Sequence, residues 1–404
     1  MKILFLTLSD FKSINERNIY TDLLRVFAKN GHFVYVISPI ERKHMQKTKY
    51  IEGTNVSILK LQIGNIQKNN IIEKGISTII LESKLITGIK RYFSDITFDL
   101  IMYSTPPITF QKAVKYVKKR DHAKTYLLLK DIFPQNAVDL DLLSKTGIKS
   151  ILYNYFRNKE KKLYSLSDYI GCMSQANVDY MIKHNSEINP EIVEVCPNSI
   201  EIIDKSIDEK SKVAIREKYG IPLDKKVFIY GGNLGKPQGI DFLINCIHSQ
   251  SKNHDVFFLI VGNGTEFYKL ENFVEKYPQR NMRLMSRLPK VDYESLVAAC
   301  DIGMIFLDHR FTIPNFPCRL LSYMQAKIPV LACTDPNTDV GQVIADGGFG
   351  WWCESNNVEA FSETIKNILK ENSNEKIREQ EYQYLLDNYS VDKCYEIIMR
   401  KFIV

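Results

Sequence analysis

Residues 227–239 read VFIYGGNLGKPQG, and this stretch decides the fold of the second half of the chain. The apolar run Val227–Tyr230 predicts a buried strand, and the glycine-rich turn Gly231–Gly239 leads into residues 241–247, which read as a helix. Glycines let a backbone approach a ligand closely, and the amides of such a turn, with Lys236, can hold a diphosphate. The turn is neither G-x-G-x-x-G nor a P-loop, so dinucleotide and ATP binding lose support. A glycine-rich turn between a strand and a helix, taken by itself, usually has only a structural role.

The alternation of short apolar strands with longer helical patterns extends over the whole chain. The expected strands are Ile3–Thr7, Phe33–Ser38, Val56–Leu61, Leu100–Tyr103, Thr125–Leu129, Tyr169–Met173, Ile192–Val195, Val227–Tyr230, Val256–Gly262, Met282–Met285, Ile302–Leu307 and Val330–Cys333. Strands that alternate with helices indicate βαβ units and parallel sheets covered on both faces. We therefore expect an α/β chain with two Rossmann-like, doubly wound domains, residues 1–200 and 201–386. The polar residues 201–212 are the expected linker between them.

The composition is that of an ordinary globular chain of 404 residues, with 45% hydrophobic and 25% charged residues. No apolar run reaches the roughly 18 residues that a membrane-spanning helix needs. The first ten residues read as a strand and not as a signal peptide. The eight cysteines form no C-x-x-C pair, which indicates free thiols in a cytoplasmic protein. The seven histidines show no metal-ligand spacing, so neither a metal nor a cofactor is expected.

The charge is divided unevenly along the chain. Residues 1–200 contain 29 Lys and Arg against 19 Asp and Glu, whereas residues 201–404 contain 25 against 28. This excess fits an anionic membrane at the first half, and it equally fits a lysine-rich solvated surface. Two basic segments with interleaved apolar residues, 84–93 and 150–164, either lie on a membrane or pack on the sheet as crossover helices. Nucleic acid is not an expected partner, because no nucleic-acid-binding motif accompanies the charge.

Polar or flexible groups follow several consecutive strands of the second half. Gly262 and Gly264 end one strand, Arg287 and Leu288 follow the next, and Arg319 stands in the first turn of a helix expected from Pro317. Because the carboxyl ends of parallel strands share one edge, these groups are expected where doubly wound folds bind ligands.

The ordered set GGNLGKPQGID, VGNGTE, RLP, ACDIG and RLLSYMQAKIPVLA resembles the donor domain of family 4 glycosyltransferases of the two-Rossmann GT-B fold. The similarity is closest to the fucosaminyltransferase-like branch of bacterial O-antigen and capsule biosynthesis. The segments KDIFPQNAVDL (130–140), SDYIGCMS (167–174) and CPNSIE (196–201) extend it to essentially residues 1–400. The resemblance implies two domains across a cleft, with the acceptor bound by the first and the donor by the second. It also implies that residues 387–404 cross back to the first domain, and that the anomeric configuration is retained.

The resemblance also implies individual site residues. The implied donor-binding residues are Gly232, Asn233, Lys236, Gln238, Gly262, Gly264, Arg287, Leu288, Arg319, Leu320, Ser322, Asn337, Thr338 and Asp339. Asp131 is the implied catalytic residue, although a helix cap is the commoner role of such an Asp. Lys130 and Gln135 are its implied acceptor-binding neighbours.

Four positions depart from the family pattern. Asn233 and Gln238 replace the usual Arg and Lys of the donor loop, which leaves Lys236 as the phosphate cation. Pro314 and Ser322 replace the usual pair of glutamates, and a serine can contact a ribose only weakly or through water.

We therefore expect a cytoplasmic glycosyltransferase, peripheral on the inner face of the plasma membrane. It would move a sugar from a nucleotide-diphosphate donor, with UDP the expected nucleotide, to a lipid-linked bacterial surface glycan. Two alternatives stay open. One is a nucleotide-sugar epimerase of the same fold, and the other is a non-catalytic sugar-nucleotide-binding scaffold subunit, to which Pro314 and Ser322 point.

Overall fold

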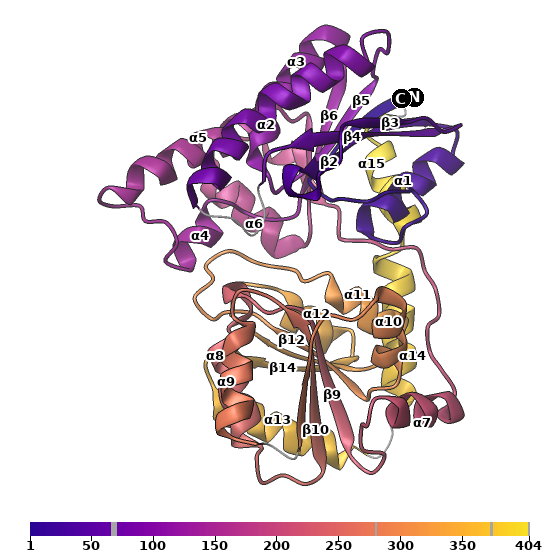
Figure 1. Cartoon of the computed structure of the whole chain (residues 1–404), viewed down its shortest axis with the longest axis vertical. Coiled ribbons are helices and arrows are strands. Elements are labelled where there is room, and N and C mark those ends of the chain that lie inside the picture. Colours follow the sequence, from indigo (N-terminus) through magenta and orange to yellow (C-terminus); the bar gives the residue numbers. More distant parts are fainter. Residues whose placement is uncertain (66–70, 279–280, 372–374, 403–404) are drawn as a thin grey trace. The chain divides into compact units, whose positions relative to one another are not determined.

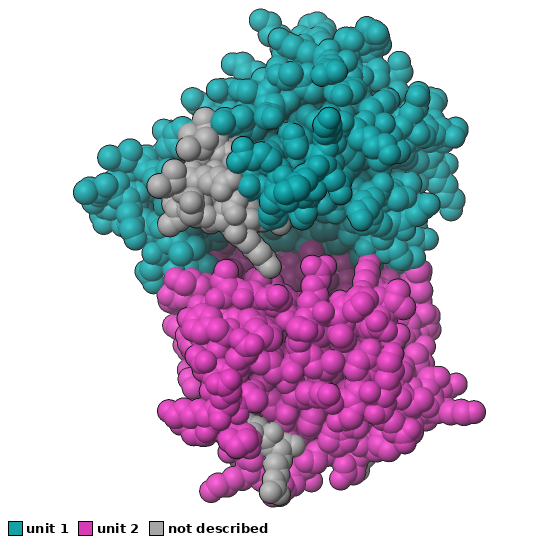
Figure 2. Space-filling model, viewed as in Figure 1, with its two compact units in different colours: residues 1–201, 391–404 teal, residues 202–390 magenta. Residues whose placement is uncertain are grey.

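The computed structural model describes residues 1–65, 71–278, 281–371 and 375–402, and it divides into two compact units (Figures 1 and 2). Unit 1 comprises residues 1–201 and 391–404, and unit 2 comprises residues 202–390. Each unit has its own sheet and its own apolar cores, so each is described by itself.

Unit 1 is built on an eight-stranded sheet in the order β3-β4-β2-β1-β5-β6-β7-β8. All neighbours are parallel except β3, which runs antiparallel to β4. The strands are β1 (Lys2–Leu6), β2 (Phe33–Glu41), β3 (Lys49–Ile51), β4 (Val56–Ile63), β5 (Leu100–Ser104), β6 (Lys124–Leu129), β7 (Tyr169–Cys172) and β8 (Val193–Val195). The sequence does not predict β3, because its three residues lack the length of an apolar run.

The helices of unit 1 cover both faces of this sheet (Figure 1). They are α1 (Ile19–Lys29), α2 (Ile71–Tyr92), α3 (Gln111–Asp121), α4 (Gln135–Asp139), α5 (Lys149–Leu166), α6 (Gln175–His184) and α15 (Val391–Met399). Alternate side chains of β1 enter two separate cores. Leu4 and Leu6 pack with residues of α2 and α3, whereas Ile3 and Phe5 pack with residues of α1 and α15.

The last helix therefore belongs to unit 1, as expected for a chain that crosses back. Val391, Cys394 and Ile398 of α15 share a core with α1. The buried Sγ atoms of Cys196 and Cys394 lie 3.2 Å apart. This face of the unit 1 sheet is thus closed by residues from opposite ends of the chain.

Unit 2 has a six-stranded parallel sheet in the order β11-β10-β9-β12-β13-β14. The strands are β9 (Lys226–Asn233), β10 (Val256–Asn263), β11 (Met282–Met285), β12 (Ile302–Phe306), β13 (Val330–Thr334) and β14 (Gly350–Glu354). The helices are α7 (Glu209–Lys218), α8 (Ile240–Ser249), α9 (Phe267–Lys276), α10 (Lys290–Ala298), α11 (Arg319–Gln325), α12 (Val340–Asp346), α13 (Val358–Lys370) and α14 (Glu375–Asn388). The sequence does not predict β14.

Two expectations about unit 2 are wrong in detail. The expected linker 201–212 is not all linker, because α7 begins at Glu209, where the side chain of Asp208 accepts a hydrogen bond from the amide of Ser211 and caps the helix. The helix expected from Pro317 begins at Arg319, and the amide of Leu320 is already bonded to the carbonyl of Pro317.

The glycines at the carboxyl ends of β9 and β10 allow two chain segments to approach closely. Gly232 is paired in register with Gly262. A Cβ atom on Gly262 would lie 2.0 Å from the carbonyl oxygen of Gly232, and one on Gly264 would lie 2.2 Å from that of Leu234. Gly262 and Gly264, predicted as donor-binding residues, are therefore explained by backbone packing alone.

Gly262→Ala is expected to lower the free energy of unfolding by about 1–3 kcal/mol, because backbone must move to admit the methyl group. Urea denaturation measures this loss. Gly235→Ala is the matched control, since the nearest atom to its Cβ would be a side-chain nitrogen of Asn233 at 3.1 Å, which can move. Equal losses in the two variants would contradict the packing role.

Candidate functional site

The carboxyl edge of the unit 2 sheet holds a half-buried arginine, Arg319, beneath a glycine turn. The guanidinium carbon of Arg319, at the start of α11, lies 4.3 Å from the ring centroid of Tyr230 in β9. A Cβ atom on Gly232 would lie 3.7 Å from Nη2 of Arg319, so the turn passes close to the guanidinium. Nη1 of Arg319 is buried and has no hydrogen-bond partner among the described residues. An unsatisfied charged donor beside an open turn suits an anionic ligand.

Arg319 remains charged in this setting. Burial disfavours the charged guanidinium, but the neighbouring Tyr230, Tyr323 and Tyr293 outweigh burial, and the pKa of Arg319 lies above its usual value. The aromatic face of Tyr230 also stabilises the cation. The sequence identifies Arg319 as a candidate, but it does not identify Tyr230 as the ring against which Arg319 packs.

Lys236 supplies a second cation from the same turn. It begins the 3-10 turn Lys236–Gln238, its side chain is exposed, and it forms no ion pair with the residues that the structure describes. Asn233 and Gln238, the two positions that depart from the family pattern, are bonded to each other: Nδ2 of Asn233 donates to Oε1 of Gln238 at 2.8 Å. Oε1 of Gln238 also accepts from the amide of Gly235 at 3.3 Å. These two predicted donor ligands therefore hold the shape of the turn.

The remaining predicted donor residues do not all reach this edge with their side chains. Leu320 is fully buried in the core, so its side chain is not available to a ligand. Arg287 is exposed after β11, Leu288 beside it is half-buried, and Ser322 is half-buried on α11. The structure therefore brings Gly232 and Arg319 together, and it leaves Arg287 and Leu288 on a separate loop.

The loop after β13 is tied to the segment before α11. Nδ2 of Asn337 donates to the carbonyl of Phe311 at 2.6 Å, and Oγ1 of Thr338 donates to that of Asn315 at 2.5 Å. Asp339 stands at the start of α12. The predicted sugar-contacting side chains Asn337 and Thr338 thus hold one loop to another.

Asp335 in the same loop is a further candidate, which the sequence does not indicate. Its Oδ1 accepts the amides of Asn337 and Thr338 at 2.9 and 3.2 Å, while its buried Oδ2 has no partner among the described residues. Burial raises the pKa of Asp335 to about 6, against the opposing effect of those amides. In the sequence, Asp335 is marked only by its place two residues after the expected strand Val330–Cys333.

Unit 1 places Asp131 two residues after the end of β6. Nδ2 of Asn136 donates to both carboxylate oxygens of Asp131 at 2.8 Å, and Oγ1 of Thr105 donates to its carbonyl at 3.1 Å. Burial raises the pKa of Asp131 to about 6, although hydrogen bonds from the amide of Ile132 and from Asn136 lower it. A carboxyl group that titrates near neutral pH is suited to proton transfer.

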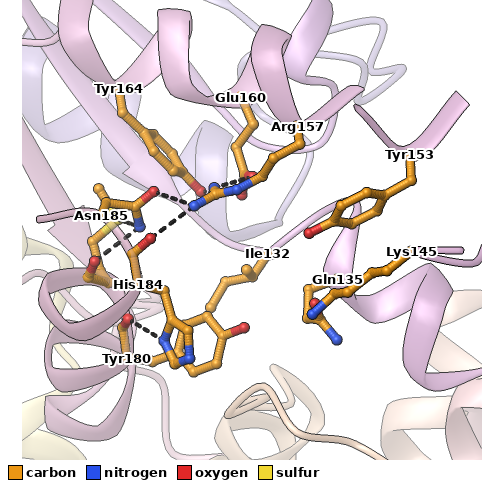
Figure 3. Close-up of a pocket in the computed structure, with 11 residues that line it drawn as sticks. Ile132, Gln135, Lys145, Tyr153, Arg157, Glu160, Tyr164, Tyr180, His184 and Asn185 are labelled. Atoms are coloured by element: carbon orange, nitrogen blue, oxygen red, sulfur yellow. Dashed lines mark hydrogen bonds and ion pairs between the residues drawn. The ribbon is translucent and has the colours of Figure 1, made fainter. Parts of the chain in front are cut away.

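A pocket of about 90 Å³ lies beside this segment, between α4, α5 and α6 (Figure 3). It is lined by Ile132, Gln135, Lys145, Tyr153, Arg157, Glu160, Tyr164, Tyr180, Met181, His184 and Asn185. Arg157 donates to Glu160, to the carbonyl of His184 and to Oδ1 of Asn185. Tyr180 stacks on His184 with ring centroids 3.9 Å apart. Aromatic faces beside fixed polar groups form a cavity of the kind that takes small polar ligands.

The two predicted acceptor residues lie in different places. Gln135 lines the pocket in Figure 3, where its Nε2 donates to Oδ1 of Asp139 at 2.6 Å. Nζ of Lys130 instead donates to the carbonyl of Cys196 at 3.2 Å, and Lys130 lines a smaller pocket with Asn198 and Cys394. The structure therefore does not bring Lys130 and Gln135 together.

The residues that the structure describes offer neither a metal-ion site nor a membrane-spanning helix. None of their His, Cys, Asp and Glu side chains form a group of three or more that could hold a metal ion. None of the helices in this part of the chain is long and apolar enough to cross a membrane.

Residues 211–384 match the family described as glycosyl transferases group 1. The chain is 24% identical over 313 residues to the probable glycosyltransferase WbjE of Pseudomonas aeruginosa, covering 75% of this chain and 74% of that protein. It is 22% identical over 276 residues to WcaI of Escherichia coli K12, a putative colanic acid biosynthesis glycosyl transferase, covering 67% and 66%.

The fold is shared with solved structures. The crystal structure of HepE from Anabaena in complex with UDP-glucose superposes with a TM-score of 0.68 at 15% identity, covering 99% of each chain. This similarity establishes the two-domain GT-B architecture expected from the sequence.

Proposed function

We propose that this chain, a glycosyltransferase of the GT-B fold with a group 1 domain in its second unit, transfers a sugar from a nucleotide-diphosphate donor to a lipid-linked surface glycan. The observation that carries the proposal is the buried, unpartnered Nη1 of Arg319 beneath the Gly232 turn. A guanidinium at the start of α11 and an exposed lysine in the turn after β9 suit the two phosphates of such a donor.

UDP is the proposed nucleotide. The complex of HepE with UDP-glucose supports this choice, because it belongs to a protein of the same fold. The proposal assigns neutralisation of the diphosphate to Lys236 and Arg319 and includes neither metal nor cofactor. As the glycosidic bond breaks, the leaving nucleoside diphosphate gains negative charge, and fixed cations then stabilise the transition state more than the bound donor.

The acceptor is proposed to bind unit 1. Asp131 would orient or deprotonate the attacking hydroxyl, and the pocket of Figure 3 would hold a polar part of the acceptor. The name of WcaI, which places that protein in the biosynthesis of a polysaccharide, supports a glycan acceptor. A lipid-linked acceptor would bring the enzyme to the inner face of the plasma membrane. Retention of configuration, and membership of the fucosaminyltransferase-like branch, rest on the resemblance of the sequence motifs.

A nucleoside-diphosphate release assay with a panel of nucleotide sugars tests the proposed function. Steady release that depends on a glycan acceptor is the expected result. Interconversion of the sugar without release would instead identify an epimerase, and binding without either reaction would identify a scaffold subunit. Neither of these alternatives is favoured by the relatives, which are named as glycosyltransferases.

Lys236→Ala is expected to weaken the stabilisation of the protein by UDP. A ligand at 100 times its Kd stabilises the folded state by about 2.7 kcal/mol, so UDP should raise the Tm of the wild type clearly and that of the variant less. Lys252→Ala is the matched control, because this exposed lysine precedes β10 at the amino edge of the sheet. An equal UDP effect on all three proteins would place the donor phosphates elsewhere.

A further inference from the structure

The two basic segments of unit 1 have different surroundings, although their sequences look alike. In the first, Leu85, Ile89 and Phe93 are buried in the core that α2 shares with the sheet. Segment 84–93 is therefore a crossover helix packed on the sheet, which is one of the two alternatives that the sequence leaves open for it. The second segment, on α5, is buried only toward its carboxyl end, at Glu160, Leu163 and Tyr164.

The amino-terminal end of α5 carries an apolar stripe that faces solvent. Ile148 is 89% exposed and Ile151 is 73% exposed, and Leu152 and Tyr155 are exposed as well. The spacing 148, 151, 152 and 155 puts these four side chains on one face of a helix. Leu142, in the preceding loop, is also exposed. We call these five residues the α5 tip.

Positive charge surrounds the α5 tip. Residues 145–162 contain six Lys and Arg and one acidic residue, Glu160, which is buried against Arg157. Lys145 lies over the ring of Tyr153, and neither Lys145 nor Lys149 forms an ion pair with any residue in the described part of the chain. Lys159 and Lys161, in contrast, are paired with Glu82 and Glu187 at 2.7 and 3.1 Å. The unpaired lysines are thus those nearest the exposed apolar residues.

We propose that the α5 tip is a membrane-contact surface that inserts its apolar side chains into the interface of an anionic bilayer. Apolar residues of an interfacial helix enter the boundary between headgroups and acyl chains, while flanking lysines pair with acidic lipids. The proposal rests on the proposed function for its purpose, because a lipid-linked acceptor lies in such a bilayer. The pocket of Figure 3 shares Lys145 and Tyr153 with this end of α5, so the polar part of the acceptor would enter it beside the lipid surface.

Co-sedimentation of the full chain with vesicles tests the α5 tip. The wild type is expected to bind vesicles of phosphatidylcholine with 30% phosphatidylglycerol far better than vesicles of phosphatidylcholine alone. The double variant Ile148→Asn/Ile151→Asn should bind the anionic vesicles at least about tenfold more weakly. Lys145→Glu/Lys149→Glu should weaken binding by a similar factor at low salt, and this effect should shrink as salt rises. Both pairs are exposed, so thermal melting should match that of the wild type.

The matched control changes the same charge at another place. Lys84→Glu/Lys90→Glu lies on exposed positions of α2. It is expected to change vesicle binding less than about twofold, since no exposed apolar stripe flanks these lysines among the side chains that the structure describes. A tryptophan in place of Ile151 gives an independent readout. Its fluorescence should shift to the blue on anionic vesicles if position 151 enters the bilayer.

Three results would overturn the proposal. One is absence of wild-type binding to anionic vesicles, and another is an equal loss in the tip and control variants. The third is a dimer in sedimentation velocity that Ile148→Asn/Ile151→Asn dissociates, without vesicle binding, because the tip would then be an interface between two copies. Stabilisation by UDP is measured without lipid, so failure of the membrane contact and failure of the donor site are distinguishable.

Discussion

Arg319→Ala is expected to lower kcat/KM by about 10²-fold, with part of the loss in kcat. The guanidinium is held against Tyr230, so it is fixed before the donor binds. Its Nη1 has no partner among the described residues. A cation already in place stabilises the developing charge of the leaving group without reorganisation. The measurement is steady-state kinetics of nucleoside-diphosphate release.

Arg319→Lys separates charge from geometry. Lysine keeps the positive charge but loses the planar group that stacks on Tyr230 and donates several hydrogen bonds. We expect an activity between those of the wild type and of Arg319→Ala. Thermal melting without ligand shows whether either variant has lost its fold, and UDP should stabilise both less than the wild type. Normal turnover and full UDP stabilisation in Arg319→Ala would show that the donor site lies elsewhere.

Asp131→Asn is expected to lower kcat by about 10²–10⁴-fold while it leaves UDP binding unchanged, because a positioned proton acceptor contributes that much. The pH dependence follows from the pKa of about 6. The carboxyl must be ionised to accept a proton, so activity should rise as pH increases through about 6. Wild-type turnover in a stably folded Asp131→Asn would reduce Asp131 to a structural role.

Asn136→Ala makes this prediction sharper. The amide of Asn136 lowers the pKa of Asp131, so its removal should move the midpoint of the pH profile upward. Asp335→Asn is the control, since Asp335 in unit 2 also has a pKa raised to about 6. If Asp335→Asn, and not Asn136→Ala, moved the midpoint, the titrating group would be Asp335.

The same pKa affects stability with a definite sign. The pKa of Asp131 in the folded state lies above its usual value of 3.8, so folding favours the protonated form. The contribution of this group to the free energy of unfolding therefore falls as pH rises from about 4 to 6. Asp131→Asn should remove that part of the pH dependence.

The sequence predicts the parallel sheets well because each strand is a local apolar run. All twelve expected strands appear, since runs such as Val256–Gly262 are long enough to be recognised. The three residues of β3 are too few to be recognised as an apolar run, and β14 is also not predicted from the sequence. The helix start at Arg319 is misplaced because Pro317 fits the first turn of a helix as well as the loop before one.

The site is predicted less completely because side-chain partners lie far apart in the sequence. Tyr230 and Arg319 are 89 residues apart, and no local pattern connects them. The glycines of the motifs cannot be told apart in the sequence. In the structure, Gly262 is needed for backbone packing, whereas Gly232 is exposed and lies close to Arg319. The segments 84–93 and 150–164 have the same basic and apolar character, and only the tertiary structure decides which apolar side chains are buried.

The position of α15 has a consequence for biosynthesis. Unit 2 is complete once Ser390 has been synthesised, whereas the face of the unit 1 sheet under α1 still lacks its second helix. Until α15 has left the ribosome, Phe5 and Phe27 lack the apolar partners that this helix provides. Unit 1 therefore begins before unit 2 in synthesis and is completed after it. A chain that stops before Val391 would present an uncovered apolar surface to chaperones and proteases.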